Sequence, residues 1–241
     1  MMRDDGRPVI VTVHPAPPAG PHPDLIHEHV ARVRELEHVL LELPIADGNL
    51  DGRAWVMEAV PPHLAALDRL HAGPLPLAHG VSAIRDLARA LAATHRKGLT
   101  HGAISLETVR ITPDGARLGG VGRSMSGSVR GDLDALGEVA WALLSGDVEA
   151  PALRPLSRVR RGIAPNLEAL CLSMRAPDPR HRPQRAEAIL DALDAVPTRR
   201  SNSLASIVDV GLHDVRPQRA VAWLVVGVAT FMLFALLQSR G

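Results

Sequence analysis

Apolar and polar residues alternate along the first third of the chain in patterns typical of short strands and one amphipathic helix. The predicted elements are a strand from Val9 to Val13, a helix from Asp24 to Glu37, strands from Val39 to Ile45 and Ala54 to Val60, and a short helix from His63 to Leu70. Asp24 can cap the first helix. The pattern therefore predicts a small α+β lobe in residues 1–77.

Helical spacing dominates the middle of the chain. Val81 to Lys97 carries one apolar stripe and ends at Gly98, a residue typical of helix C-termini. Asp132 to Gly146 is apolar on most of its circumference, as expected of a buried helix. Further helices follow Asn166 and include Ala186, so a mostly helical second lobe is predicted in residues 78–196.

Between these helices the pattern changes to that of a β-hairpin. Val109 and Ile111 alternate with polar residues, Pro113-Asp114-Gly115 is a turn sequence, and Leu118 continues the returning strand. The hairpin is therefore expected to connect the two long helices of the second lobe.

Composition narrows the choice of function. The chain has 241 residues, which suits one medium domain with an appendage. Its net charge of +1 gives no argument for a nucleic acid partner. The single cysteine, Cys171, lies on an apolar stripe and is expected in the core.

The last part of the chain predicts a membrane anchor. After a loosely patterned linker, residues 197–219, the stretch Ala220 to Leu237 contains no charge and spans about 27 Å as a helix, close to the thickness of a bilayer. A buried core helix is the alternative. Arg216 and Arg219 precede the span, and Met1 to Asp5 lacks the apolar core of a secretory signal, so we expect a single-pass membrane protein with a cytoplasmic N-terminal domain.

The motif that carries the chemistry lies between Leu99 and Gly122. Its sequence reads His101-Gly102-Ala103-Ile104-Ser105-Leu106-Glu107-Thr108, followed by the hairpin and by Gly120-Val121-Gly122. This arrangement resembles the catalytic loop H-R-D-L-K-P-E-N and the metal-binding D-F-G of bacterial serine/threonine protein kinases. The resemblance implies a two-lobed kinase-like fold, with a truncated N-lobe because the segment before Val9 is too short for the glycine-rich loop and its strands.

The same resemblance implies that the reacting groups are lost. The five degenerate positions are Thr12 for the strand Lys, Ala103 for the catalytic Asp, Ser105 for the loop Lys, Thr108 for the metal-binding Asn and Gly120 for the Asp of D-F-G. The only Lys, Lys97, lies beyond the region where a phosphate-binding Lys is needed. The sequence thus predicts a pseudokinase that is not an enzyme and holds no metal and no cofactor.

Four positions resemble structural residues of the family. They are Glu28 on the small-lobe helix, His101 in the loop, Asp132, which would accept hydrogen bonds from the loop backbone, and Arg182 in Asp178-Pro179-Arg180-His181-Arg182-Pro183. The family's partner of that arginine is absent, so Arg182 is expected to find another partner or face water. Met57 is expected near the back of the interlobe pocket.

Three functions stay open from the sequence. The leading hypothesis is a membrane-anchored pseudokinase that acts as a protein-binding scaffold or regulator. The alternatives are an atypical nucleotide-dependent transferase of kinase-like fold and a helical membrane-anchored domain unrelated to kinases. For the first, Arg123 and Arg130 flank a short Ser/Gly-rich segment and are candidate partner-binding residues, although a trimmed and solvated loop explains them equally well.

Overall fold

A computed structural model of the chain describes residues 8–17, 19–121, 123–124, 126–149 and 154–196. These residues belong to one compact unit, Met1–Thr198. The predicted linker 197–219 and membrane segment 220–237 lie outside the described residues. Within the described part, no helix combines the length and the apolar character needed to cross a membrane.

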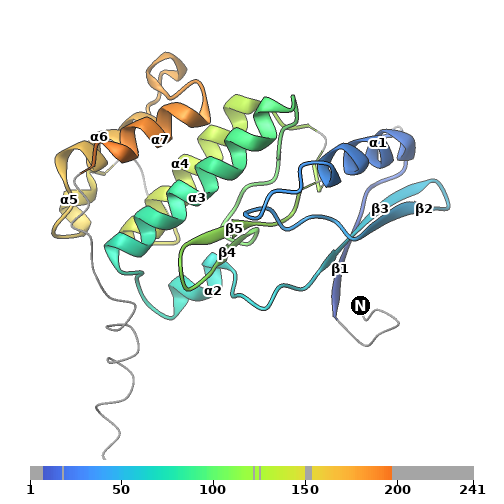
Figure 1. Cartoon of the computed structure of the whole chain (residues 1–241), viewed down its shortest axis with the longest axis horizontal. Helices are drawn as coiled ribbons and strands as arrows, with labels where there is room; N and C mark the ends of the chain where they lie inside the picture. Colours follow the sequence, from blue (N-terminus) through green and yellow to red (C-terminus); the bar gives the residue numbers. More distant parts are fainter. Residues whose placement is uncertain (1–7, 18, 122, 125, 150–153, 197–241) are drawn as a thin grey trace, which may run out of the picture. The chain divides into compact units, whose positions relative to one another are not determined.

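The small lobe is a three-stranded antiparallel sheet with one helix on it (Figure 1). Strands β1 (Val9–Val13) and β2 (Ala46–Leu50) both pair with the central strand β3 (Arg53–Ala59). Helix α1 (Pro23–Arg34) packs on the sheet through a separate small apolar cluster. The cluster consists of Ile26, Val30, Ala54 and Val56.

The second strand lies later in the chain than predicted. Residues 39–45 form no strand of this sheet, and β2 is instead built from the polar run Ala46–Leu50. Its turn, Asp51-Gly52, has φ angles of 51° and 76°, the left-handed pair that a tight two-residue hairpin requires. The sequence Asp-Gly is typical of such a turn.

The start of α1 also differs from the prediction. The residue that caps this helix is His22, whose Nδ1 accepts the N–H of Asp24, so Asp24 lies inside the first turn. Its carboxylate there still complements the helix dipole.

The large lobe is mostly helical, as predicted, but it also includes the short helix that was predicted in the small lobe, because Ala66 and Leu70 pack in the large core. Its elements are α2 (Ala66–His71), α3 (Leu77–Arg96), the hairpin of β4 (Val109–Ile111) and β5 (Ala116–Leu118), α4 (Val129–Ser145), α5 (Leu156–Val159), α6 (Pro165–Met174), the 3-10 turn η1 (Pro179–His181) and α7 (Ala186–Asp194). Figure 1 shows α3 and α4 side by side with the hairpin next to α3. Helix α3 begins before the predicted Val81, and Ser82, which lies inside the helix, donates its hydroxyl to the Asp114 carbonyl.

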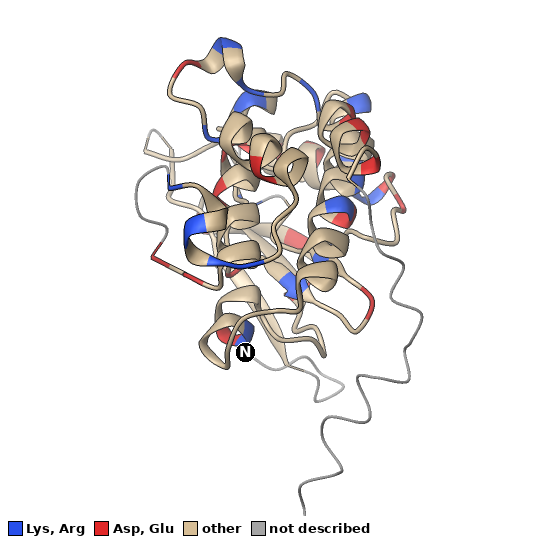
Figure 2. Ribbon diagram, turned by 90° about the vertical axis from the view of Figure 1, so that its left-hand side faces the viewer, with Lys and Arg blue, Asp and Glu red and all other residues tan. Residues whose placement is uncertain are grey.

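One continuous apolar core fills the large lobe, and α4 lies in it. Gly137 on α4 lets α6 approach closely, since a Cβ at this position would lie 3.1 Å from the Met174 carbonyl oxygen. Cys171 is buried in the same core, as predicted, and burial raises its pKa to about 12. Charged residues of both signs are interspersed over the ribbon (Figure 2).

The two lobes are joined by backbone hydrogen bonds. The segment that follows α1 runs beside β5, where the Glu42 N–H donates to the Leu118 carbonyl at 2.9 Å and the Leu118 N–H donates to the Leu40 carbonyl at 2.8 Å. Of the residues 39–45 predicted as a strand of the small sheet, Leu40 to Glu42 therefore pair with the hairpin of the large lobe, while the Ile45 N–H donates to the Met57 carbonyl of β3.

Candidate functional site

The loop that follows α3 is held by a buried histidine. His101 is 0% exposed, and its Nε2 donates to the Gly119 carbonyl at 3.0 Å while its Nδ1 accepts the Ala103 N–H at 3.2 Å. Burial lowers the pKa of His101 to about 4, against the opposing effects of the Asp132 charge and the Gly119 carbonyl. The imidazole is therefore neutral at pH 7, with both nitrogens satisfied.

Asp132, on the first turn of α4, lies directly beneath this loop. It accepts the N–H groups of His101 at 2.8 Å and Gly102 at 2.7 Å, which is the contact that the family resemblance implies. A third donor, His95 Nε2 on α3, lies 2.9 Å from the same carboxylate. Burial alone would raise the pKa of Asp132, but these hydrogen bonds outweigh it and lower the pKa below its usual value.

The polar side chains of the loop turn inward onto the loop itself. Thr108 is 4% exposed, and its Oγ1 accepts the Ser105 N–H at 2.9 Å and lies 3.0 Å from the Ala103 carbonyl oxygen. Ser105 Oγ in turn accepts the Glu107 N–H at 3.2 Å. The position that binds metal in kinases thus closes a turn in this chain.

Gly120 lies opposite Thr108 and is enclosed by side chains. Its φ is +82°, and a Cβ there would lie 2.8 Å from Thr108 Cγ2 and 3.2 Å from Arg123 Cδ. The Gly120 N–H donates to Glu58 Oε1 at 2.7 Å, and Arg123 Nε donates to Glu58 Oε2 at 2.7 Å. An arginine side chain therefore fills the space into which a residue at position 120 would project.

Glu58 is the functional residue that the sequence interpretation missed. It is 4% exposed and belongs to the sheet face that also carries Val56 and Thr12, because Thr12 pairs with Val56 and Ile10 with Glu58. Met57, expected at the back of the pocket, points to the opposite face of the sheet. The alternation of Ala54, Val56 and Glu58 on one face was the signal available in the sequence.

Two predicted small-lobe residues do not meet. Thr12 lies on the α1 side of the sheet, but Glu28 on α1 is exposed. The contacts of α1 with the core come from its other face, at Pro23, Ile26, Val30 and Val33. Glu28 therefore takes no part in the interlobe site.

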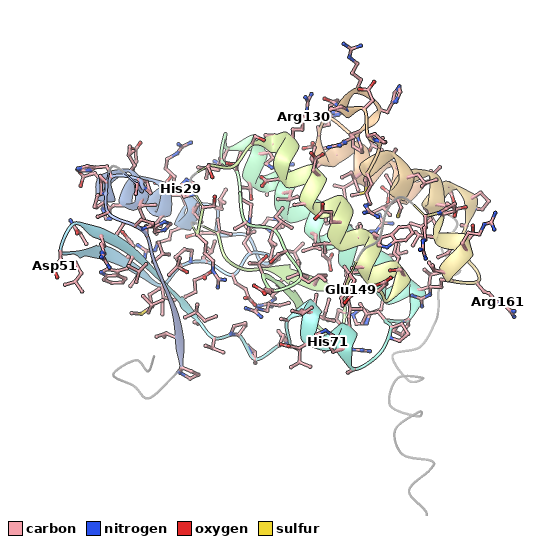
Figure 3. The ribbon with its side chains drawn as sticks, turned by 180° about the vertical axis from the view of Figure 1, so that it is seen from behind. His29, Asp51, His71, Arg130, Glu149 and Arg161 are labelled. Carbon is pink, nitrogen blue, oxygen red and sulfur yellow. The ribbon has the colours of Figure 1, made fainter. Side chains whose placement is uncertain are left out.

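The arginines predicted from the sequence are all engaged. Arg182 forms an ion pair with Asp134 on α4 and donates to the Ala176 carbonyl at 2.5 Å, so it has found another partner. Arg123 pairs with Glu58, and Arg130 donates to Gln184 Oε1 at 3.2 Å. Arg130 is labelled in Figure 3 near the start of α4. Arg123 and Arg130 thus have partners within the chain, and their role in binding another protein stays a prediction.

The shortened segment after Gly120 does not leave the loop open. A Cβ on Gly127 would lie 2.8 Å from the Gly102 Cα and 2.8 Å from Thr100 Oγ1. The glycine at each position allows this approach of two backbones. Gly127 thus lies against the loop at Gly102, within the part of the segment that the structure describes.

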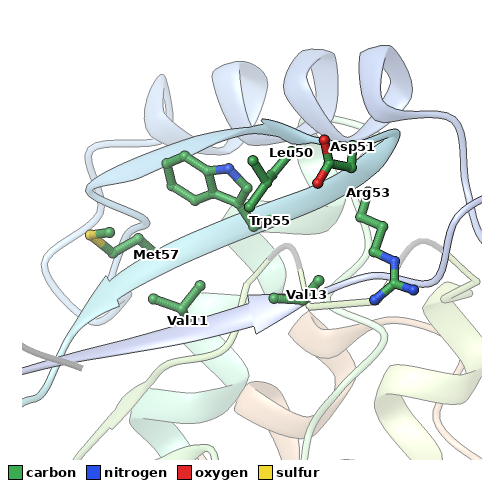
Figure 4. A pocket seen from close by; sticks show the side chains of 7 residues that line it. All are labelled: Val11, Val13, Leu50, Asp51, Arg53, Trp55 and Met57. Carbon is green, nitrogen blue, oxygen red and sulfur yellow. The ribbon is translucent and has the colours of Figure 1, made fainter.

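A hollow of about 650 Å³ lies away from this chemistry, on the outer face of the small sheet (Figure 4). It is lined mainly by apolar side chains, including Val11, Val13, Trp55 and Met57. The Glu58 carboxylate lies on the other face, so this hollow is no part of the interlobe site.

Comparisons with known proteins bear on the fold. No family model matches the sequence, and no curated protein matches it. The structure is similar to solved structures of the PknI kinase domain of Mycobacterium tuberculosis. One is 21% identical, with a TM-score of 0.60, over 71% of this chain and 77% of that chain. A second has a TM-score of 0.59 at 21% identity and the same coverage, and a single-substitution mutant has 0.60 at 20% identity, over 71% and 76% of the chains.

The chain thus has a protein-kinase-like fold, and the alternative of a helical domain without it is wrong. One further prediction needs correction. The substitutions led us to expect that the chain is not an enzyme, whereas the structures it resembles are protein kinase domains, which are enzymes. The physical reason is that core packing and contacts such as that between Asp132 and the His101 N–H determine the fold. The substituted motif positions therefore do not decide whether a chain with this fold is an enzyme.

Proposed function

We propose that this chain is a pseudokinase in a specific sense: its interlobe site does not hold magnesium–ATP in the manner of protein kinases, and the domain acts by binding another protein. The observation that carries the proposal is the position of Arg123. Its side chain lies beside Gly120, where a Cβ would be 3.2 Å from Arg123 Cδ, and its charge is already neutralised by Glu58.

The residues at this site do not fit a magnesium ion. Mg²⁺ requires oxygen ligands in octahedral arrangement, usually with one or two carboxylates. Here Gly120 has no side chain, and Thr108 Oγ1 is occupied within its own loop. The carboxylate within reach, Glu58, is bound by a guanidinium and by a backbone N–H. A divalent cation would have to displace Arg123 and would gain few ligands in return.

The closed contact between the lobes also supports a binding role. In this chain the Glu58 carboxylate links β3 to the Gly120 backbone, so the chain's own groups make this contact. A preformed surface of this kind binds a protein with little loss of conformational entropy.

The likeness to kinase domains favours a second candidate, an atypical nucleotide-dependent transferase. Such an enzyme would use groups other than Ala103, Thr108 and Gly120. The two candidates differ in one measurable property, which is stabilisation by nucleotide.

Thermal unfolding with and without ATP, with magnesium or with EDTA, tests the proposal. A ligand at 100 times its Kd stabilises a protein by about 2.7 kcal/mol, so millimolar ATP reveals even weak binding. We expect no magnesium-dependent rise in Tm. The variant Arg123→Ala is the matched comparison, since it empties the space beside Gly120. A magnesium-dependent rise in the unchanged chain, together with phosphate release, would support the transferase instead.

We also propose that Ala220 to Leu237 anchors the chain in a membrane. The support is the uncharged length of this stretch and the arginines, Arg216 and Arg219, before it. Removing residues 220–241 should release the chain from the membrane fraction. A shortened chain that still sediments with membranes would show that another segment or a partner holds it there.

A further inference from the structure

A groove of about 400 Å³ lies on the large lobe between α2, the segment 104–107 and α4. Its floor is apolar. Ile104 and Leu106 are only partly buried although they pack against the core, and Val139 closes the groove from α4. Leu67 on α2 also lines the groove, and its N–H donates to the Leu106 carbonyl at 3.0 Å. Val139 is itself buried, so Ile104, Leu106 and Leu67 provide the partly exposed apolar surface within the part of the chain that the structure describes.

The rim of this groove is acidic. Glu107 and Glu138 line it and are exposed, and the lining contains no Lys or Arg. Further carboxylates follow or precede other lining residues in the sequence: Asp68 adjoins Leu67, and Asp147 and Glu149 flank Val148. Figure 3 labels Glu149 beyond the end of α4, near α2. We call the groove with these carboxylates the acidic groove.

The carboxylates of Glu107 and Glu138 differ from three carboxylates that are paired within this domain. Asp132, Asp134 and Glu58 are each bound by a His or Arg side chain. Among the described residues, no ion pair and no side-chain hydrogen bond satisfies Glu107 or Glu138. Their charges are therefore available to a cationic partner.

We propose that the acidic groove binds a segment of a partner protein in which apolar side chains are flanked by Lys or Arg. The apolar side chains would cover Ile104 and Leu106, and the basic groups would pair with Glu107 and Glu138. The rim repels nucleic acids and anionic membrane surfaces, which leaves a protein as the fitting partner. The inference rests on the proposed function, in which the domain works by binding a protein.

A synthetic helical peptide of Leu and Arg, about four turns long with Leu at every third or fourth position, is the probe. Fluorescence anisotropy with the full chain measures its affinity. The double variant Glu107→Lys/Glu138→Lys should weaken binding by at least about tenfold, since like charges replace attraction. The matched control is Glu28→Lys/Glu35→Lys, which makes the same change of net charge on an exposed residue of α1 and on its exposed C-cap and should leave binding unchanged. Circular dichroism checks that both variants fold.

Two outcomes would overturn the inference. Equal weakening by both double variants would mean that only net charge attracts the peptide, and failure of the unchanged chain to bind the peptide would mean that the groove is no docking site. Capture of proteins from native membranes separates this from the proposed function. If the unchanged chain and Glu107→Lys/Glu138→Lys capture a protein equally well, the proposed binding function stands but the acidic groove is not its site. If neither chain captures a protein specifically, the proposed function itself is wrong.

Discussion

Glu58 and Arg123 connect the two lobes through one buried ion pair. Arg123 Nε donates to Glu58 Oε2 at 2.7 Å, and the other carboxylate oxygen accepts the Gly120 N–H at the same distance. Glu58 is almost fully buried, whereas Arg123 keeps some access to water. Because the carboxylate has left water, it depends on these two donors for its solvation.

Removing one member of this pair should cost more than removing both. Arg123→Leu leaves the Glu58 charge buried without its cation, for which we expect a loss of about 3 kcal/mol in the free energy of unfolding. Glu58→Leu/Arg123→Leu replaces the pair by apolar groups and should recover much of that loss, because no buried charge remains. Urea unfolding of the single and double variants measures the coupling. Additive losses would show that the two side chains do not interact.

Asp132 should stabilise the domain through three donors rather than through catalysis. Asp132→Ala leaves the His101 and Gly102 N–H groups and His95 without their acceptor, at a cost of about 1 to 3 kcal/mol. Asp132→Asn is the matched control, since its amide retains one acceptor oxygen and should lose less. Denaturant unfolding measures both. If Asp132→Ala unfolds like the unchanged chain, the hydrogen bonds beneath the loop contribute nothing.

Much of the fold was predictable because its signals are local. Val81 to Lys97 carries a helical stripe ended by Gly98, which has a φ of +67° in the structure. The hairpin around Pro113-Asp114-Gly115 formed as its alternation predicts. Such features depend on neighbouring residues, so periodicity and turn chemistry identify them.

The interlobe site depends on contacts that the sequence does not display. Successive residues of β3 face opposite sides of the sheet, and the sequence allows either side to face the large lobe. A shift of one residue in this assignment replaces Met57 by Glu58 in the interlobe site. The partner of Glu58, Arg123, is distant in sequence and lies in a loop. Strand β2 forms from Ala46–Leu50 because it pairs with β3, although its polar composition gives little strand signal by itself.

Cys171 should be unreactive in the folded protein. Burial raises the pKa of its thiol to about 12, so almost no thiolate is present near neutral pH, and the sulfur is also covered by the core. Alkylation by iodoacetamide at pH 8, followed by mass spectrometry, should modify the chain only after unfolding in urea. The urea sample is the control for reagent activity. Rapid modification without urea would place this residue outside the core.

His101 should make the domain sensitive to mild acid. Its ordinary pKa is 6.5 and burial lowers it to about 4, so between these values the unfolded chain binds a proton that the folded chain does not. The contribution of His101 to the free energy of unfolding is therefore fully present above pH 6.5. It falls by up to about 1.4 kcal/mol per pH unit as the pH is lowered to 4. His101→Gln removes this titration, so its stability should vary less with pH, although it is lower at pH 7. Urea unfolding between pH 7 and 4 compares the two slopes, and equal slopes would show that His101 becomes protonated without cost.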